Sequence, residues 1–301
     1  MITLEEILPM KKIIDIHNHP NWHGHNIDQL VANMNKHGIS KTWLLSWELP
    51  EKEFNVEPAY HKCMDPRGLS APLWMVIEGL QKYPSRFIGG WAPDPRDRHT
   101  RAKLEAAVNI HGIRVYGEMK LRMRYDDPDA ISMYHQCARL KLPVLFHLEA
   151  PPFMLEKQNS DTLQWQPWYG GGIEVVENMC KICPDTIFIG HGPGWWREIS
   201  ADANKSSKSY PGGKVEKDGA IVVLMRKYKN LYGDLSAGSG RNALARDMKH
   251  AKSFIHEFQD KLLFGRDYFD NALMKTLLEL KLENKIMKKL LYENAEKLIN
   301  T

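Results

Sequence analysis

Short apolar runs alternate along the chain with longer amphipathic stretches. Eight runs have the length and residue types of β-strands, and several are apolar throughout, as is typical of strands covered on both faces. They lie at residues 12–17, 41–47, 87–91, 112–117, 143–147, 186–190, 230–234 and 262–264. Between them, apolar residues recur at helical spacing, as in residues 27–37, 71–83, 100–110, 129–140, 173–183 and 243–258.

This order of elements predicts the fold class. Strand followed by helix, repeated eight times, is the order of an α/β protein built as a (β/α)8 TIM barrel, and residues 284–299 predict a last helix. A doubly wound sheet also alternates strands and helices, but it would carry a glycine-rich phosphate loop after its first strand. Here that place holds HNHPNWHGH, which argues against nucleotide binding.

The length and composition favour one domain. The chain has 301 residues, 43% hydrophobic and 26% charged, which is ordinary for a globular protein with one large core. The long polar stretch SADANKSSKSYPGGKVEKDG follows the sixth predicted strand. We therefore predict a single domain over residues 1–301, with an extended loop at about 194–219 over the mouth of the barrel.

The charge excludes one class of partner. Lys and Arg number 41 against 37 Asp and Glu, a net charge of +4, which is too balanced for a protein that binds nucleic acid through its phosphates. Small anionic molecules stay open as substrates. The sequence shows neither a signal peptide nor an apolar stretch long enough to span a membrane, so we expect a cytoplasmic protein. A homo-oligomer is compatible with the sequence.

Four cysteines occur in the chain, at Cys63, Cys137, Cys180 and Cys183. They are too few and too scattered for the disulfide framework of a secreted protein. Cys180 and Cys183 form a CxxC pair at the end of a predicted helix, and no second pair completes a zinc site. We expect them to be structural, with redox or metal use as the alternative.

The candidate chemistry begins in the first strand, IIDIHNHP. His17 and His19 are two residues apart, so on an extended strand both imidazoles project from one face. Imidazole is the commonest protein ligand for zinc and several other transition metals. The pair alone is weak evidence, and the metal hypothesis depends on further ligands elsewhere.

Polar residues also end other predicted strands. His147 ends strand five, His191 ends strand six, and Asp267 follows strand eight. The carboxyl ends of the strands of a barrel meet at one rim, so these side chains should converge with the first pair. A metal site is therefore predicted at that rim.

Glu118 directly follows strand four in the motif GIRVYGEMK. A carboxylate at this position could bridge two metal ions. The alternative is a salt bridge at the rim with Lys120 or Arg122.

Taken together, this pattern resembles the amidohydrolase superfamily, and within it the amidohydrolase-2 family of metal-dependent hydrolases and decarboxylases. The resemblance runs along essentially the whole chain. It implies that His17, His19 and Asp267 hold one divalent metal, commonly zinc, with His147 as a further ligand. It also implies that His191 is either a ligand of a second metal or a base and hydrogen-bond donor to the substrate.

The number of metal ions stays open. Two-metal members of the superfamily carry a carboxylated lysine, or sometimes a glutamate, on strand four. The position of the lysine is Arg114 in this chain, whereas Gly117 and Glu118 are similar to the glutamate variant of TatD-type deoxyribonucleases.

The expected chemistry follows from such a site. A divalent ion with three or four protein ligands keeps a position for water and lowers its pKa towards neutrality. Asp267 would act as the general base and His191 would polarise the reacting carbonyl. We therefore expect a hydrolase of a small carboxylic ester, lactone or amide.

Two other functions compete with hydrolysis. Relatives with the same ligands include nonoxidative decarboxylases and hydratases. Several of the decarboxylating relatives carry Glu-x-His where this chain has His-x-His. A barrel that binds metal and ligand without turnover is the third hypothesis. Loop residues near the strand ends are candidates for substrate contacts, and the ones we single out are Trp22, His23, Arg122, Trp195, Trp196 and Arg266.

Overall fold

The computed structural model describes residues 12–50, 71–150, 170–206 and 208–300. The strands are short and buried: β1 Ile14–Asn18, β2 Lys41–Leu45, β3 Phe87–Gly90, β4 Tyr116–Met119, β5 Val144–His147, β6 Phe188–His191, β7 Leu231–Asp234 and β8 Leu262–Leu263. The main helices between and after them are α2 Ile27–Lys36, α3 Leu73–Lys82, α4 Thr100–His111, α5 Pro128–Arg139, α7 Ile173–Ile182, α9 Ala220–Lys227, α10 Ala237–Ala245, α11 Met248–Phe258, α12 Ala272–Glu279, α13 Asn284–Lys288 and α14 Asn294–Asn300.

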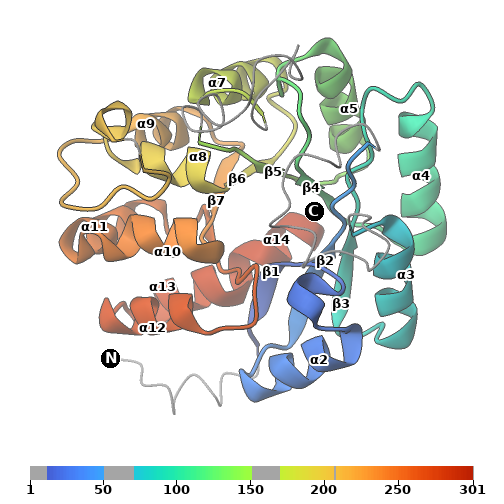
Figure 1. The fold of residues 1–301 in the computed structure, drawn as a ribbon, viewed down its shortest axis with the longest axis horizontal. Helices are drawn as coiled ribbons and strands as arrows, with labels where there is room; N and C mark the ends of the chain where they lie inside the picture. Colours follow the sequence, from blue (N-terminus) through green and yellow to red (C-terminus); the bar gives the residue numbers. More distant parts are fainter. Residues whose placement is uncertain (1–11, 51–70, 151–169, 207, 301) are drawn as a thin grey trace.

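The strands form two parallel sheets that join at both edges. One sheet has the order β1-β2-β3 and the other β4-β5-β6-β7-β8. A parallel bridge between Gly90 and Val115 links β3 to the residues before β4. At the other edge, the Ile16 amide donates a hydrogen bond to the Phe264 carbonyl over 3.0 Å. The predicted α/β barrel is confirmed, with the helices arranged around the strands (Figure 1).

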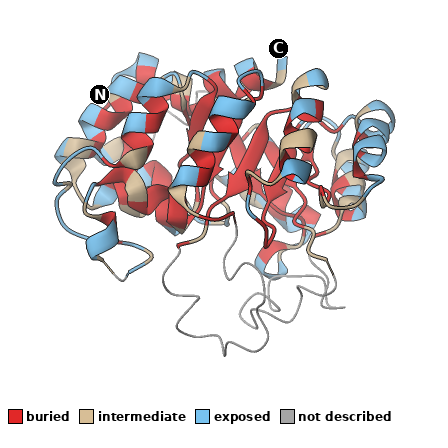
Figure 2. Cartoon of the chain, turned by 90° about the horizontal axis from the view of Figure 1, so that it is seen from above, coloured by how far each residue is buried: buried red, intermediate tan, exposed pale blue. Residues whose placement is uncertain are grey.

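Two apolar layers hold this arrangement together. The larger lies between the strands and the surrounding helices, and the exposed residues lie on the outer helix faces (Figure 2). The second layer lies inside the barrel, where Trp43 and Leu145 meet residues of several other strands. Ala295 and Leu298 of α14 belong to this inner layer, and α14 lies at the centre of the ring of elements in Figure 1. The last helix therefore closes one end of the barrel.

The fourth strand lies later in the chain than predicted. It spans Tyr116–Met119 instead of 112–117, because pairing with β5 begins at Tyr116, while Val115 makes only an isolated bridge to β3. Glu118 consequently lies within the strand and not after it.

The predicted helix 243–258 is two helices. Asp247 separates them: its backbone is extended, and its side chain accepts a hydrogen bond from the His250 amide, which caps the start of α11. The segment predicted as an extended loop contains the short helices Pro193–Trp196, Arg197–Ile199 and Ala203–Lys205.

The three cysteines that the structure describes are buried free thiols. Burial raises the pKa of Cys180 to about 12 and that of Cys183 to about 11. The reactive thiolate is therefore disfavoured, in agreement with a structural role. Cys63 lies outside the described residues. Among the helices that the structure describes, none is long and apolar enough to cross a bilayer.

Candidate metal centre

The carboxyl ends of the strands bring the predicted ligands together. Three overlapping groups have ligand atoms that all lie within 4.8 Å of one another. They are His17, His19 and Glu118; His17, His191 and Asp267; and Glu118, His147 and His191. These six side chains are separated by up to 250 positions in the sequence and meet only because parallel strands end at one rim.

Hydrogen bonds fix the orientation of three imidazoles. The Nδ1 atoms of His17 and His191 lie 2.7 and 3.0 Å from the same carboxylate oxygen of Asp234. The Nδ1 atom of His19 donates to the carbonyl of Leu45 over 2.9 Å. The Nε2 atoms of these rings therefore face the centre, where those of His17 and His19 are 3.2 Å apart. Partners of this kind fix the tautomer and direction of metal-binding histidines.

The Glu118 carboxylate lies between two sets of histidines. Its Oε2 atom is 3.4 Å from His19 Nε2 and 3.9 Å from His17 Nε2. Its Oε1 atom is 2.9 Å from His147 Nδ1 and 3.8 Å from His191 Nε2. Each oxygen thus faces its own group of nitrogens, as a bridging carboxylate would require.

Asp267 completes the rim from the loop after β8. Its Oδ1 atom is 3.7 Å from the Nε2 atoms of both His17 and His19, and its Oδ2 atom is 3.7 Å from His191 Nε2. Within the described residues, Oδ1 is buried and has no hydrogen bond. Its backbone has a left-handed φ of 54°, and Trp22 Nε1 donates to its carbonyl over 2.8 Å. A buried carboxylate oxygen without a donor is suited to a cation.

The electrostatics of the centre also favour a cation. Burial opposes protonation of His17, but the carboxylates of Asp267 and Asp234 raise its pKa to about 10. Burial likewise opposes ionisation of Glu118, yet its hydrogen bond with His147 holds its pKa well below the usual range. Asp234 also has a lowered pKa, against burial, because His17 and His191 bind it. Nitrogen and carboxylate donors of this number fit a divalent metal such as zinc or manganese.

Three polar residues of this centre were missed by the sequence reasoning. Asp234 orients two histidines, and Ser236 donates from its Oγ atom to Asp234 over 2.7 Å. Glu149 lies 3.3 Å from the Nε2 atom of His147. Asp234 could have been found, because it ends the predicted strand 230–234 as the candidate ligands end theirs. Nothing in the sequence distinguishes Ser236 or Glu149 from ordinary loop residues.

The residues predicted to contact substrate fall into separate environments. Trp22 and His23 line a pocket beside Asp267. Arg266 is also at this pocket, but its guanidinium binds Asp15, with Nε 2.8 Å from Oδ2, so its main role is structural.

The two adjacent tryptophans are core residues. Trp195 and Trp196 are 0% and 1% exposed. The Trp195 ring packs against Phe146, and Trp196 donates from Nε1 to the Asp234 carbonyl over 2.7 Å. Two adjacent tryptophans are costly to expose, as the sequence argument assumes. In this chain the apolar core covers both rings. Arg122 is also buried, at 6% exposure.

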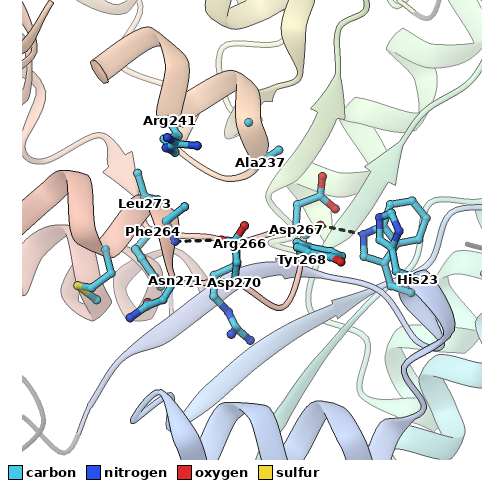
Figure 3. A pocket seen from close by; sticks show the side chains of 14 residues that line it. His23, Ala237, Arg241, Phe264, Arg266, Asp267, Tyr268, Asp270, Asn271 and Leu273 are labelled. Carbon is cyan, nitrogen blue, oxygen red and sulfur yellow. Dashed lines mark hydrogen bonds between the residues drawn. The ribbon is translucent and has the colours of Figure 1, made fainter. Parts of the chain in front are cut away.

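The pocket beside Asp267 has a volume of about 250 Å³. It lies between helix α10, the loop after β8 and the residues after β1, and Figure 3 shows Arg241 and Ala237 across from Tyr268. The residues that line it include Trp22, His23, Ala237, Gly238, Arg241, Arg266, Asp267, Tyr268, Asp270 and Asn271. It thus adjoins the metal centre through Asp267.

Comparison with known proteins identifies related folds. A family model described as Amidohydrolase matches residues 14–301. No curated protein matches the chain.

Solved structures share the fold at low sequence identity. An uncharacterised TIM-barrel protein of Bordetella bronchiseptica is 18% identical, with a TM-score of 0.59 over 96% of this chain and 98% of its own. A dihydroxybenzoic acid decarboxylase of a Polaromonas species, solved with manganese and the inhibitor 2-nitroresorcinol, is 17% identical, with a TM-score of 0.55 over 96% and 97%. A protein of Pseudomonas putida assigned as a 2-pyrone-4,6-dicarboxylic acid hydrolase is 13% identical, with a TM-score of 0.58 over 96% and 97%.

Proposed function

Because the chain belongs to the amidohydrolase family, we propose that it is a metal-dependent hydrolase of a small carboxylic ester, lactone or amide. The observation that carries this proposal is the convergence of histidine nitrogens and carboxylate oxygens from separate strand ends. The pocket that adjoins the centre, with a volume of about 250 Å³, supports a small molecule as the substrate.

The ligand atoms divide into two half-sites that share Glu118. The Nε2 atoms of His17 and His19 face Oε2, while His147 and His191 face Oε1. Asp267 lies 3.7 Å from the Nε2 atoms on both sides, those of His17 and His19 and that of His191. These residues would hold one or two divalent ions, and the donor set would suit zinc. When bound, a divalent metal acts as a Lewis acid and lowers the pKa of water.

Two side chains have the geometry for proton transfer and for binding the reacting carbonyl. Asp267 presents a buried carboxylate oxygen that no described donor satisfies, so it can take the proton of an attacking water and return it to the leaving group. His191 is held by Asp234 through Nδ1, and its Nε2 atom faces Asp267 at 3.7 Å. Because Asp234 accepts the Nδ1 proton and burial lowers the pKa of His191, the Nε2 atom of the neutral ring carries a lone pair. It can bind a metal ion, or it can take up a proton and then donate a hydrogen bond to the oxygen on which negative charge develops.

Nonoxidative decarboxylation is the second candidate. The structural similarity to a dihydroxybenzoic acid decarboxylase and to a 5-carboxyvanillate decarboxylase favours it, since these proteins have the same fold over nearly the whole chain. The two reactions place different demands on the site: hydrolysis needs an attacking water beside Asp267, and decarboxylation needs a site that binds a carboxylate and protonates carbon.

Metal analysis tests the centre directly. We expect purified protein to contain one or two equivalents of a divalent metal, and the double variant His17→Ala/His19→Ala to lose most of it. Both rings point Nε2 into the centre, so their removal takes both histidine nitrogens from the half-site at Glu118 Oε2. The matched control is His99→Ala/His111→Ala, since both residues are exposed at the ends of α4. An unchanged metal content in the first variant would contradict the proposal.

A substrate panel separates the two reactions. Lactones, esters and amides are assayed beside aromatic carboxylic acids, with acid release and carbon dioxide release measured in parallel. We expect turnover of a lactone or ester, and its loss by about a thousandfold or more in His17→Ala/His19→Ala. Carbon dioxide release without ester, lactone or amide turnover would assign the chain to the decarboxylases instead.

A further inference from the structure

His147 is turned the opposite way from the other histidines of the centre. In those rings the Nδ1 atom faces an acceptor away from the centre, as the Nδ1 atom of His17 faces Asp234 over 2.7 Å. In His147 the Nδ1 atom faces the centre, where it lies 2.9 Å from Glu118 Oε1. Its Nε2 atom lies 3.3 Å from the Oε2 atom of Glu149. His147 thus has a carboxylate oxygen beside each ring nitrogen.

The direction of the ring decides which nitrogen can bind a metal. A neutral imidazole carries a proton on one nitrogen and a lone pair on the other. When Glu149 accepts the Nε2 proton of His147, the lone pair lies on Nδ1, the atom that faces Glu118. A hydrogen-bond acceptor behind the ring commonly fixes metal-binding histidines in this way. Glu149 is therefore to His147 what Asp234 is to two of the other rings.

Two glycines let the segment after β5 pack closely against the loop after β6. The Leu148 amide donates to the His191 carbonyl over 2.8 Å, and the Gly194 amide donates to the Leu148 carbonyl over 2.7 Å. A Cβ atom on Gly194 would lie 2.1 Å from the carbonyl oxygen of Glu149, and one on Gly192 would lie 2.7 Å from that of Leu148. A side chain at either position would displace the backbone that carries Glu149.

The carboxylate of Glu149 is fixed as well. Its Oε1 atom accepts a hydrogen bond from the Ala150 amide over 2.9 Å, which leaves Oε2 for His147. The side chain is 13% exposed, so ordering it against the ring costs little further freedom. Glu149 does not belong to the three groups of metal-ligand atoms found among the described residues. Its contact with the centre therefore runs through His147.

We propose that Glu149 is a positioning residue of the metal centre, which holds the His147 ring with Nδ1 towards Glu118. The proposal rests on the proposed function, since it assumes a divalent metal at this centre. It applies to hydrolysis and to decarboxylation alike, because both candidate reactions use the metal. Glu149 adds a third support to the centre, beside Asp234 and the Leu45 carbonyl. This support serves only the half-site at Glu118 Oε1.

Zinc affinity separates this role from those of the other supports. Wild-type protein and Glu149→Ala are compared by competition with a chelator. We expect Glu149→Ala to weaken binding of the zinc that contacts His147 by about 10–100-fold, the usual effect of losing such a partner. Zinc binding at the half-site of His17 and His19 should stay within about threefold of wild type, because the acceptors of these two rings are unchanged.

Glu149→Gln is the matched variant. Its side-chain amide oxygen can still accept the Nε2 proton of His147, so zinc affinity should fall by about threefold or less. The control is Glu105→Ala, which removes an exposed glutamate from the outer helix α4 and should leave zinc affinity unchanged. Circular dichroism of the three variants should match that of the wild type.

The His147 ring provides a second readout that does not depend on affinity. Long-range proton–nitrogen correlation spectra of the zinc-loaded protein distinguish a protonated ring nitrogen from a metal-bound one, and His147→Asn assigns the signals of this ring. We expect a proton on Nε2 and metal on Nδ1 in the wild type and in Glu149→Gln. Glu149→Ala should lose this pattern, whereas loss of a carboxylate that only supports the loop would leave it intact.

The outcomes distinguish the two proposals. Three results would each overturn the role of Glu149: unchanged zinc affinity in Glu149→Ala, equal losses in Glu149→Ala and Glu149→Gln, or a His147 ring protonated at Nδ1 in the zinc-loaded wild type. Each of them is compatible with a metal-loaded, active hydrolase. Wild-type protein without bound metal, or turnover that the histidine variants do not change, would instead overturn the proposed function.

Discussion

The two ends of the barrel are built from the same strands but differ in chemistry. At the end where the strands begin, Ala295 and Leu298 of α14 pack against the inner apolar layer, and Lys12 binds Glu296 over 2.8 Å. At the other end the interior holds buried histidines and carboxylates, among them His17 and Glu118. One end gains stability from apolar burial, while the other end buries ionisable groups that need partners.

At the polar end, hydrogen-bond partners offset the cost of burying polar groups. Each ring nitrogen of the metal centre that faces away from the centre has an acceptor, as His19 has in the Leu45 carbonyl and His17 and His191 have in Asp234. Apolar packing inside the barrel holds the strands in place, and the polar contacts are made from the carboxyl ends of these strands. Substitutions at the two ends should therefore affect different measurements: the free energy of unfolding at the apolar end and the metal affinity at the polar end.

The largest effect on stability is expected at the apolar end. Leu298→Ala removes a side chain that is 6% exposed and packs on the inner layer. The free energy of unfolding should fall by about 2–3 kcal/mol, from lost burial and from the cavity left behind. Chemical denaturation measures this change, and metal affinity measured at the same temperature should remain within about twofold of wild type.

Ile110→Ala serves as the control, because Ile110 is 72% exposed on α4. Its unfolding free energy should change by less than about 0.5 kcal/mol. A large loss of metal affinity in Leu298→Ala would show that the two ends are coupled through the strands. It would contradict the expected independence of unfolding free energy and metal affinity.

The next effect concerns Asp234 at the polar end. Asp234→Asn keeps the size of the side chain but removes the charge that holds the Nδ1 atoms of His17 and His191. We expect metal affinity to fall by about 10–100-fold, the usual effect of losing such a partner. Affinity is measured by competition with a chelator. Ser236→Ala removes only one donor to the carboxylate and should have a smaller effect.

An equal loss in Asp234→Asn and Ser236→Ala would mean that the charge of Asp234 is not what matters. A normal affinity in both would contradict the orienting role. Circular dichroism should be unchanged in the two variants, because neither residue belongs to an apolar layer.

The barrel could be predicted from the sequence because the evidence for each strand and each helix is local. Each strand run is apolar and each helix is amphipathic, so the order of elements follows from neighbouring residues. The convergence of the candidate ligands was also predictable, since His147 and His191 end apolar runs and a barrel brings such ends together. The later position of β4 in the chain could not be predicted, because the extent of its pairing with β5 depends on contacts between residues that are distant in the sequence.

Side-chain direction sets the limit of such predictions. Trp195 and Trp196 follow a ligand strand and resemble substrate contacts in the sequence, but their rings turn into the core. Arg266 precedes Asp267 by one residue, yet its guanidinium turns towards Asp15. Gly238 and Arg241 gave no signal, because the pocket exists only where α10 meets the loop after β8.

The last prediction concerns the pH dependence of metal affinity at the polar end. Its effect per pH unit is expected to be the smallest. The pKa of His17 in the metal-free protein is raised from 6.5 to about 10, against burial, by Asp267 and Asp234. Metal binding needs the neutral ring, so uptake near neutral pH displaces this proton. Metal affinity should rise about tenfold per pH unit for each proton displaced, measured by chelator competition and by calorimetry in buffers of different ionisation enthalpy.

The stability of the metal-free protein should change in the opposite direction. A pKa raised on folding contributes stability that is fully present below the unfolded value of 6.5 and is lost as pH rises towards about 10. The free energy of unfolding of the metal-free protein should therefore decrease across this pH range. Leu298→Ala should lower the whole curve of unfolding free energy against pH without changing its slope. In Asp234→Asn both pH dependences should end at a lower pH, because the pKa of His17 is raised less when one of the two carboxylates is neutral. A metal affinity independent of pH would show that His17 is already neutral, and would contradict the electrostatic account of the centre.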